Sequence, residues 1–148
     1  MHYFDTSYLA PLIVDELYTA PVVDFLTTLD RSELWTSRWT LVEFASMLAR
    51  GVRMRTLSRQ EADGLQDRFE RMTASTFSVI LPETEDYTKA ASFLARTEAA
   101  LRGPDAMHLA VAENHGATAI LSLDKKMIAA GRALGLPIGT VMPLPGFP

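Results

Sequence analysis

Four acidic residues stand at or near the ends of predicted strands and helices in this chain. They are Asp5, Glu43, Asp105 and Asp124. Two carboxylates about 4 Å apart repel each other by about 4 kcal/mol at an effective dielectric constant of ~20, so a converging group of acids needs compensation. Protonation, basic neighbours or divalent cations can supply it, and carboxylate oxygens are the ligands that Mg²⁺ and Mn²⁺ prefer. A cation site is therefore one of the structures that these residues could form.

The hydrophobic pattern of the chain alternates between short strand-like runs and longer segments of helical period, which predicts an α/β domain. The predicted strands are residues 2–4, 33–37, 77–81, 118–123 and 137–142. The predicted helices are residues 7–16, 20–29, 40–51, 58–72, 85–99, the segment after Gly103 and Pro104, and residues 125–135. Because helices join the strands, we expect a mostly parallel sheet of about five strands covered on both faces, a three-layer α/β/α sandwich.

A parallel sheet would place these acids close to one another. Asp5 ends the first predicted strand, Asp124 ends the fourth, and Glu43 lies one turn into the helix that follows the second. These three residues must then lie at or near the carboxyl edge of the sheet, and Asp105 joins them if its helix begins on that side. Ligands of open α/β sheets bind at this edge.

Each of these acids also has a purely structural interpretation. Asp5 and Asp124 stand where an N-cap residue accepts hydrogen bonds from the first free amides of a helix. Thr40 and Glu43 have the spacing of a capping box. Asp105 is in a first helical turn, where the helix dipole favours a negative charge. Both interpretations stay open for each residue alone, and the occurrence of all four together favours the site.

Length and composition narrow the class of protein. A chain of 148 residues with 48% hydrophobic content predicts a single domain over residues 1–148. The absence of cysteine excludes disulfides, thiol catalysis and zinc-thiolate sites, and the three histidines do not cluster in the sequence. The N-terminus, "MHYFDTS", lacks the features of a signal peptide, and no apolar run is long enough to span a membrane. We expect a soluble cytoplasmic protein, and the net charge of -4 disfavours a generic polyanion binder.

Four segments of the chain resemble the PIN-domain ribonucleases, and most closely the toxins of VapBC-type toxin-antitoxin pairs. They are "YFDTSYLAPL", "TLVEFASML", "GPDAMHLAVAENHGATAILSLDKKM" and "ALGLPI". The resemblance covers essentially the whole chain, and its most specific part runs from Asp105 to Asp124. By this resemblance the four acids occupy the positions of the metal-binding catalytic quartet of the family, and Thr6 or Ser7 matches a neighbouring polar residue. Ser122 stands where the family often has Thr, so the hydroxyl is retained.

The resemblance implies a Mg²⁺- or Mn²⁺-dependent endoribonuclease that hydrolyses RNA phosphodiesters and acts as the toxin of a type II pair. Asp5 and Asp105 would be the principal metal ligands, with Glu43 and Asp124 holding a second cation or its water shell. It also implies an antitoxin protein as a partner, and a homodimer. We expect the antitoxin to bind an apolar groove near the first two helices and residues 50–72.

Other residues allow two interpretations. Arg50, Arg53, Arg55 and Arg59 follow the Glu43 helix and fit either a solvated helix end or a contact with RNA phosphates. His108 lies one turn after Asp105, and its apolar neighbours predict a hydrogen-bonded packing residue rather than a metal ligand.

Two alternative functions stay open. One is a PIN fold without catalysis that serves as a binding module. The other is a phosphoacceptor receiver domain, which needs adjacent acids after its first strand and a lysine at the end of its last. Thr6 follows Asp5 here and "PIGTVM" holds no lysine, so the receiver domain ranks low.

Overall fold

The centre of the protein is a parallel β-sheet. The structure is a computed structural model that describes residues 1–14 and 16–147; residue 15, inside the predicted helix 7–16, and residue 148 lie outside the described part. The strands are β1 (His2–Phe4), β2 (Leu34–Ser37), β3 (Ser78–Ile80), β4 (Ala119–Leu121) and β5 (Ile138–Gly139). Within the described residues they form one five-stranded sheet of order β3-β2-β1-β4-β5 in which every pairing is parallel.

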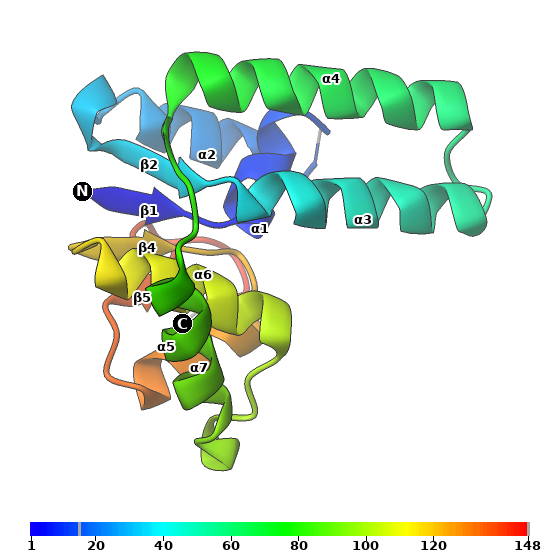
Figure 1. The fold of residues 1–148 in the computed structure, drawn as a ribbon. Helices are drawn as coiled ribbons and strands as arrows, with labels where there is room; N and C mark the ends of the chain where they lie inside the picture. Colours follow the sequence, from blue (N-terminus) through cyan, green and yellow to red (C-terminus); the bar gives the residue numbers. More distant parts are fainter. Residues whose placement is uncertain (15, 148) are drawn as a thin grey trace.

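Helices cover both faces of this sheet. They are α1 (Thr6–Leu9), α2 (Thr19–Leu26), α3 (Trp39–Arg53), α4 (Arg59–Thr76), α5 (Thr84–Leu94), α6 (Gly103–Asn114) and α7 (Lys125–Ala133). Tyr3 and Ile120 pack against residues of α5, α6 and α7, whereas Phe4 and Leu121 pack against residues of α1 to α4. The first group of helices thus covers one face of the sheet and the second group the other (Figure 1). The predicted α/β/α sandwich is confirmed. None of the helices in residues 1–14 and 16–147 has the length and hydrophobicity that crossing a bilayer requires.

Most predicted elements lie within one to four residues of their expected bounds, and three are interrupted or shortened in the structure. The helix predicted over residues 7–16 is α1 followed by a 3₁₀ turn at Ala10–Leu12, with Pro11 in its first turn. The helix predicted over residues 85–99 ends at Leu94 and gives way to a 3₁₀ turn at Thr97–Ala99, after which Ala100 has a φ of 51°. The last strand is only Ile138–Gly139, and Val141 with a φ of 63° lies beyond it. Hydrophobic spacing identifies the buried face of a segment, and it does not identify where the backbone hydrogen bonds stop.

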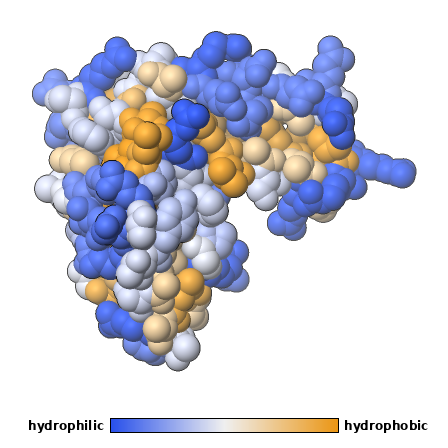
Figure 2. Space-filling model, viewed as in Figure 1, coloured by the Kyte–Doolittle hydropathy of each residue, from blue (hydrophilic) through white to orange (hydrophobic). Residues whose placement is uncertain are grey.

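Helices α3 and α4 form an antiparallel arm that extends beyond the carboxyl edge of the sheet (Figure 1). Phe44 of α3 and Phe69 of α4 stack with ring centroids 4.0 Å apart and an interplanar angle of 8°. Ser58 and Glu61 form the predicted capping box at the start of α4. In the same view the molecule is hollowed between this arm and the part built from α5 to α7 (Figure 2).

Two separate glycine substitutions test how closely α7 packs against the edge strand β5. A Cβ at Gly131 would lie 2.7 Å from Cγ2 of Ile138 in β5, whereas a Cβ at Gly64 in α4 would meet nothing within 4 Å. We expect Gly131→Ala to lower the free energy of unfolding by about 1 to 3 kcal/mol through overpacking. Gly64→Ala is expected to raise it by about 0.5 to 1 kcal/mol through helix propensity. Urea denaturation measures both, and equal stability of the two variants would contradict the close contact.

Candidate functional site

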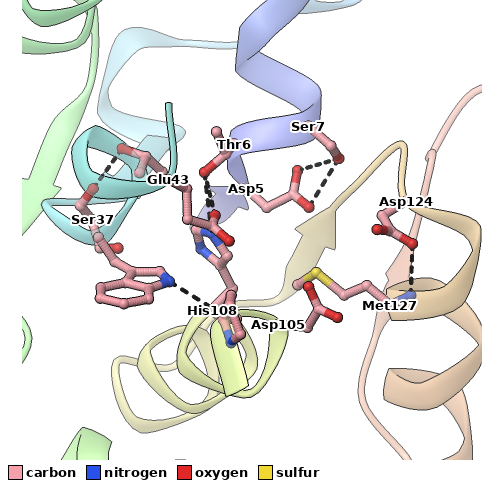
Figure 3. A network of polar contacts seen from close by, with 12 residues as sticks. Asp5, Thr6, Ser7, Ser37, Glu43, Asp105, His108, Asp124 and Met127 are labelled. Carbon is pink, nitrogen blue, oxygen red and sulfur yellow. Dashed lines mark hydrogen bonds and ion pairs between the residues drawn. The ribbon is translucent and has the colours of Figure 1, made fainter. Parts of the chain in front are cut away.

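The four predicted acids line a single pocket at the carboxyl edge of the sheet. The pocket has a volume of about 460 Å³, and Asp5, Glu43, Asp105 and Asp124 are all among its lining residues. It lies between α3 on one side and the starts of α6 and α7 on the other, where the acids converge (Figure 3). Helix α6 thus begins at the carboxyl edge of the sheet, which was the condition for Asp105 to join the other three acids.

Asp5 both caps α1 and faces this pocket. Its carboxylate accepts hydrogen bonds from the backbone N–H of Tyr8 at 2.9 Å, from Ser7 Oγ at 2.8 Å and from Ser122 Oγ at 2.6 Å. The side chain is almost fully buried, and this burial raises its pKa to about 6 against the opposing effect of His108 and these hydrogen bonds. The structural and functional interpretations of Asp5 are therefore compatible.

Asp124 and Asp105 lie on the opposite side of the pocket from α3 and share one basic partner. Asp124 Oδ1 caps α7 by accepting from the backbone N–H groups of Lys126 and Met127. Arg102 donates from Nε to Asp105 Oδ2 at 3.0 Å and from Nη2 to Asp124 Oδ2 at 3.1 Å. Burial raises the pKa of Asp105 even with Arg102 beside it. Arg102 was missed in the sequence analysis, although its position three residues before Asp105 is a helical pairing distance.

Glu43 is turned toward the sheet by contacts that the capping interpretation did not foresee. Thr40 Oγ1 donates to the carbonyl of Ser37, so the predicted Thr40–Glu43 capping box does not form. Glu43 Oε2 instead accepts from Thr6 Oγ1 at 2.6 Å and is bonded to Nε2 of His108 (Figure 3). Burial raises the pKa of Glu43, but the contacts with His108 and Thr6 outweigh it and hold this pKa below its usual range.

His108 connects Glu43 to the interior of the sheet. It is 1% exposed, and its Nδ1 lies 2.8 Å from the hydroxyl of Tyr3, which in turn lies 2.8 Å from Ser37 Oγ. Because an ionised carboxylate only accepts hydrogen bonds, Nε2 of His108 is the donor to Glu43. The predicted packing role of His108 agrees with this burial. Its contact with Glu43 was missed, because the sequence does not show which way the ring points.

The four arginines after Glu43 do not act as one group. Arg50 and Arg53 line the acidic pocket. Arg53 and Arg59 line a second groove between α3 and α4. Arg55 lies in the connection between these helices with a φ of 58°. Only part of the predicted basic run is therefore placed where a phosphate bound in the pocket could reach it.

The side chains of the pocket fit a hard divalent cation in chemical type, since they offer carboxylate and hydroxyl oxygens and no thiolate. As these side chains lie, no three acidic or histidine residues in the described part of the chain are arranged around one ion position. The guanidinium of Arg102 also lies among the acids, paired with one oxygen of Asp105 and one of Asp124.

Comparisons with known proteins agree with this architecture. The PIN domain family model matches residues 2–133. Neisseria gonorrhoeae FitAcB superposes with a TM-score of 0.70 at 17% identity over 93% of this chain and 96% of that one. Mycobacterium tuberculosis VapC20, a toxin that cleaves the sarcin-ricin loop, superposes with a TM-score of 0.70 at 18% identity. The match covers 88% of this chain and 95% of that one.

A third similar structure, FitAB bound to a DNA fragment, has a TM-score of 0.69 at 16% identity and covers 94% of each chain. No curated protein matches this chain in sequence. At these identities the solved structures establish the fold, and the family model establishes the family. The chain belongs to the PIN domain family.

Proposed function

We propose that this protein is a divalent-metal-dependent endoribonuclease that acts as the toxin of a type II toxin-antitoxin pair. The observation that carries the proposal is the convergence of Asp5, Glu43, Asp105 and Asp124, from four separate parts of a PIN fold, in one pocket. Burial raises the pKa of two of them, which is a cost to the fold that a functional site explains. Membership of the PIN family removes the basis for the receiver-domain alternative.

The roles that we propose for the acids are those that the resemblance to the PIN-domain ribonucleases implies. Asp5 and Asp105 are the principal metal ligands, and Glu43 and Asp124 hold a second cation or its water shell. Bound cations would activate water and stabilise the charge that develops on a phosphodiester. Ser7 and the other partners of Asp5 fix its carboxylate in one orientation, so the side chain loses little conformational entropy when a cation binds.

RNA is the substrate that the similarities favour. VapC20 cleaves the sarcin-ricin loop, and this chain has a comparable fold with an acidic pocket bordered by Arg50 and Arg53. Arginines beside the pocket can contact backbone phosphates on either side of a bound bond. We infer Mg²⁺ or Mn²⁺ as the cofactor from the oxygen donors.

An antitoxin partner and a homodimer are part of the same proposal. The groove between α3 and α4 is lined by Leu48, Val52 and Ala62 together with charged residues, and it lies in the region where the antitoxin is expected. Its apolar floor and basic rim suit a segment that carries both hydrophobic and acidic side chains.

Incubation of purified protein with a pool of single-stranded RNA tests this function. We expect cleavage with Mg²⁺ or Mn²⁺, none with EDTA, and none by Asp5→Asn or Asp105→Asn. Asp67→Asn, which removes an exposed acid of α4 far from the pocket, is the matched control and should cleave like wild type. A single-stranded DNA pool run in parallel tests the choice of nucleic acid.

Two results would refute the nuclease. Equal cleavage by wild type and both pocket variants would show a contaminant. Absence of cleavage by a folded protein across cellular transfer, ribosomal and messenger RNA would instead favour the binding module without catalysis.

A further inference from the structure

We propose that Arg102 is an internal cation that occupies the Asp105–Asp124 side of the pocket and competes with a divalent metal ion for these two carboxylates. This inference rests on the proposed metal-dependent function. It concerns how the chain itself controls access of the metal to its site.

The carboxylate of Asp124 is held between the N-terminus of α7 and Arg102. Its Oδ1 accepts from the backbone N–H groups of Lys126 and Met127 and so is committed to the N-terminus of α7. Its Oδ2 accepts from Arg102 Nη2 at 3.1 Å. Both carboxylate oxygens of Asp124 therefore already accept hydrogen bonds from the protein. A cation that approaches Oδ2 is repelled by the guanidinium already bonded to that oxygen, because both carry a positive charge.

Arg102 contacts Asp105 and Asp124 at the same time. Its Nε and Nη2 reach Oδ2 of Asp105 and Oδ2 of Asp124, so one planar guanidinium bridges the first turn of α6 and the cap of α7. This bridge neutralises part of the repulsion among the four acids while no metal is bound.

Arg102 is more exposed to solvent than the two acids that it bridges. Its side chain is 62% exposed, whereas those of Asp105 and Asp124 are 11% and 31% exposed. An exposed ion pair is weak, because water solvates the released guanidinium and salt screens the attraction. Arg102 can therefore leave the carboxylates without disturbing the core, and the two acids stay in place through the helices that carry them.

Titration calorimetry with MnCl₂ tests the competition in wild type, Arg102→Gln and Arg102→Lys. We expect Arg102→Gln to bind Mn²⁺ about 5-fold more tightly, the change in affinity that corresponds to removal of an exposed ion pair worth about 1 kcal/mol. Arg102→Lys keeps the charge but loses the planar bridge, so its affinity should lie between the other two. Arg96→Gln is the matched control, because Arg96 pairs with the exposed Glu98 and does not line the pocket.

An NMR measurement on wild type tests displacement directly. The Nε–H signal of Arg102, assigned by its absence from the spectrum of Arg102→Gln, should shift when Mg²⁺ is added. The Nε–H signal of Arg96 should not.

The possible outcomes separate this inference from the proposed function. Equal or weaker Mn²⁺ binding by Arg102→Gln, with metal-dependent RNA cleavage by wild type, would overturn the inference and leave the nuclease standing. Absence of Mn²⁺ binding by every protein, together with absence of cleavage, would overturn both. An unchanged Arg102 signal in Mg²⁺ concentrations that support cleavage would also overturn the competition.

Discussion

Replacement of Asp5 by Asn is expected to stabilise the metal-free protein at neutral pH while abolishing the proposed cleavage. Burial raises the pKa of Asp5 from 3.8 to about 6, so its ionised form destabilises the folded state. A rise of this size corresponds to about 3 kcal/mol above pH 6. Asn carries no charge, and its Oδ1 can still accept the N-cap hydrogen bond from Tyr8. We expect a gain of about 2 to 3 kcal/mol in the free energy of unfolding.

The pH dependence of this gain has a definite sign. Folded wild type binds the Asp5 proton more tightly than the unfolded chain does, so wild type loses stability as the pH rises from about 4 to about 6. The variant lacks this loss. The difference between the two proteins should therefore be small at pH 4 and reach a plateau above about pH 7. Urea denaturation in EDTA at several pH values measures it.

A divalent cation should reduce the difference in stability between Asp5→Asn and wild type. Mg²⁺ that binds the folded site raises the free energy of unfolding of wild type by mass action, and it should do so less for Asp5→Asn. Asp67→Asn serves as the control, since its response to Mg²⁺ should equal that of wild type. A stability difference between wild type and Asp5→Asn that stays constant from pH 4 to pH 8 would refute the buried charge. Because the inactive variant is expected to be the more stable protein, its loss of cleavage could not be attributed to unfolding.

The positions of the acids could be predicted because topology alone determines them. Asp5 and Asp124 follow strands, and the carboxyl ends of parallel strands meet at one edge whatever the exact strand lengths. Errors of three to five residues at the ends of α4, α5 and β5 therefore did not change the predicted site.

The partners of the acids could not be predicted, because they depend on side-chain direction. The residues of α6 from Asp105 to Ala112 are all buried, so this helix has no polar face whose spacing would show where His108 points. Arg102 is the residue directly before that helix, and no residue pattern shows that its side chain turns back to both Asp105 and Asp124. Thr40 and Glu43 had the spacing of a capping box, and contacts with Thr6 and His108 on other elements decided the outcome.

Replacement of His108 by Leu is expected to lower the free energy of unfolding by about 3 kcal/mol and to raise the pKa of Glu43. The change leaves Glu43 without its buried donor and the hydroxyl of Tyr3 without one of its partners. Loss of the His108 contact also removes the main interaction that holds the pKa of Glu43 down, so burial would then dominate. Urea denaturation measures the first effect, and carbon-13 NMR titration of the Glu43 carboxyl group measures the second.

Tyr3→Phe is the matched control for this variant, because it removes the hydroxyl contacts with Ser37 and His108 but keeps the contact between His108 and Glu43. Tyr3→Phe should lower the free energy of unfolding by about 1 to 2 kcal/mol and leave the pKa of Glu43 unchanged. The lowered pKa of Glu43 gives stability that is present above its ordinary value and lost as the pH falls through the folded value. The part of the His108→Leu destabilisation that comes from Glu43 should therefore become smaller as the pH falls. Equal pKa values of Glu43 in both variants would show that His108 packs beside this carboxylate without controlling its charge.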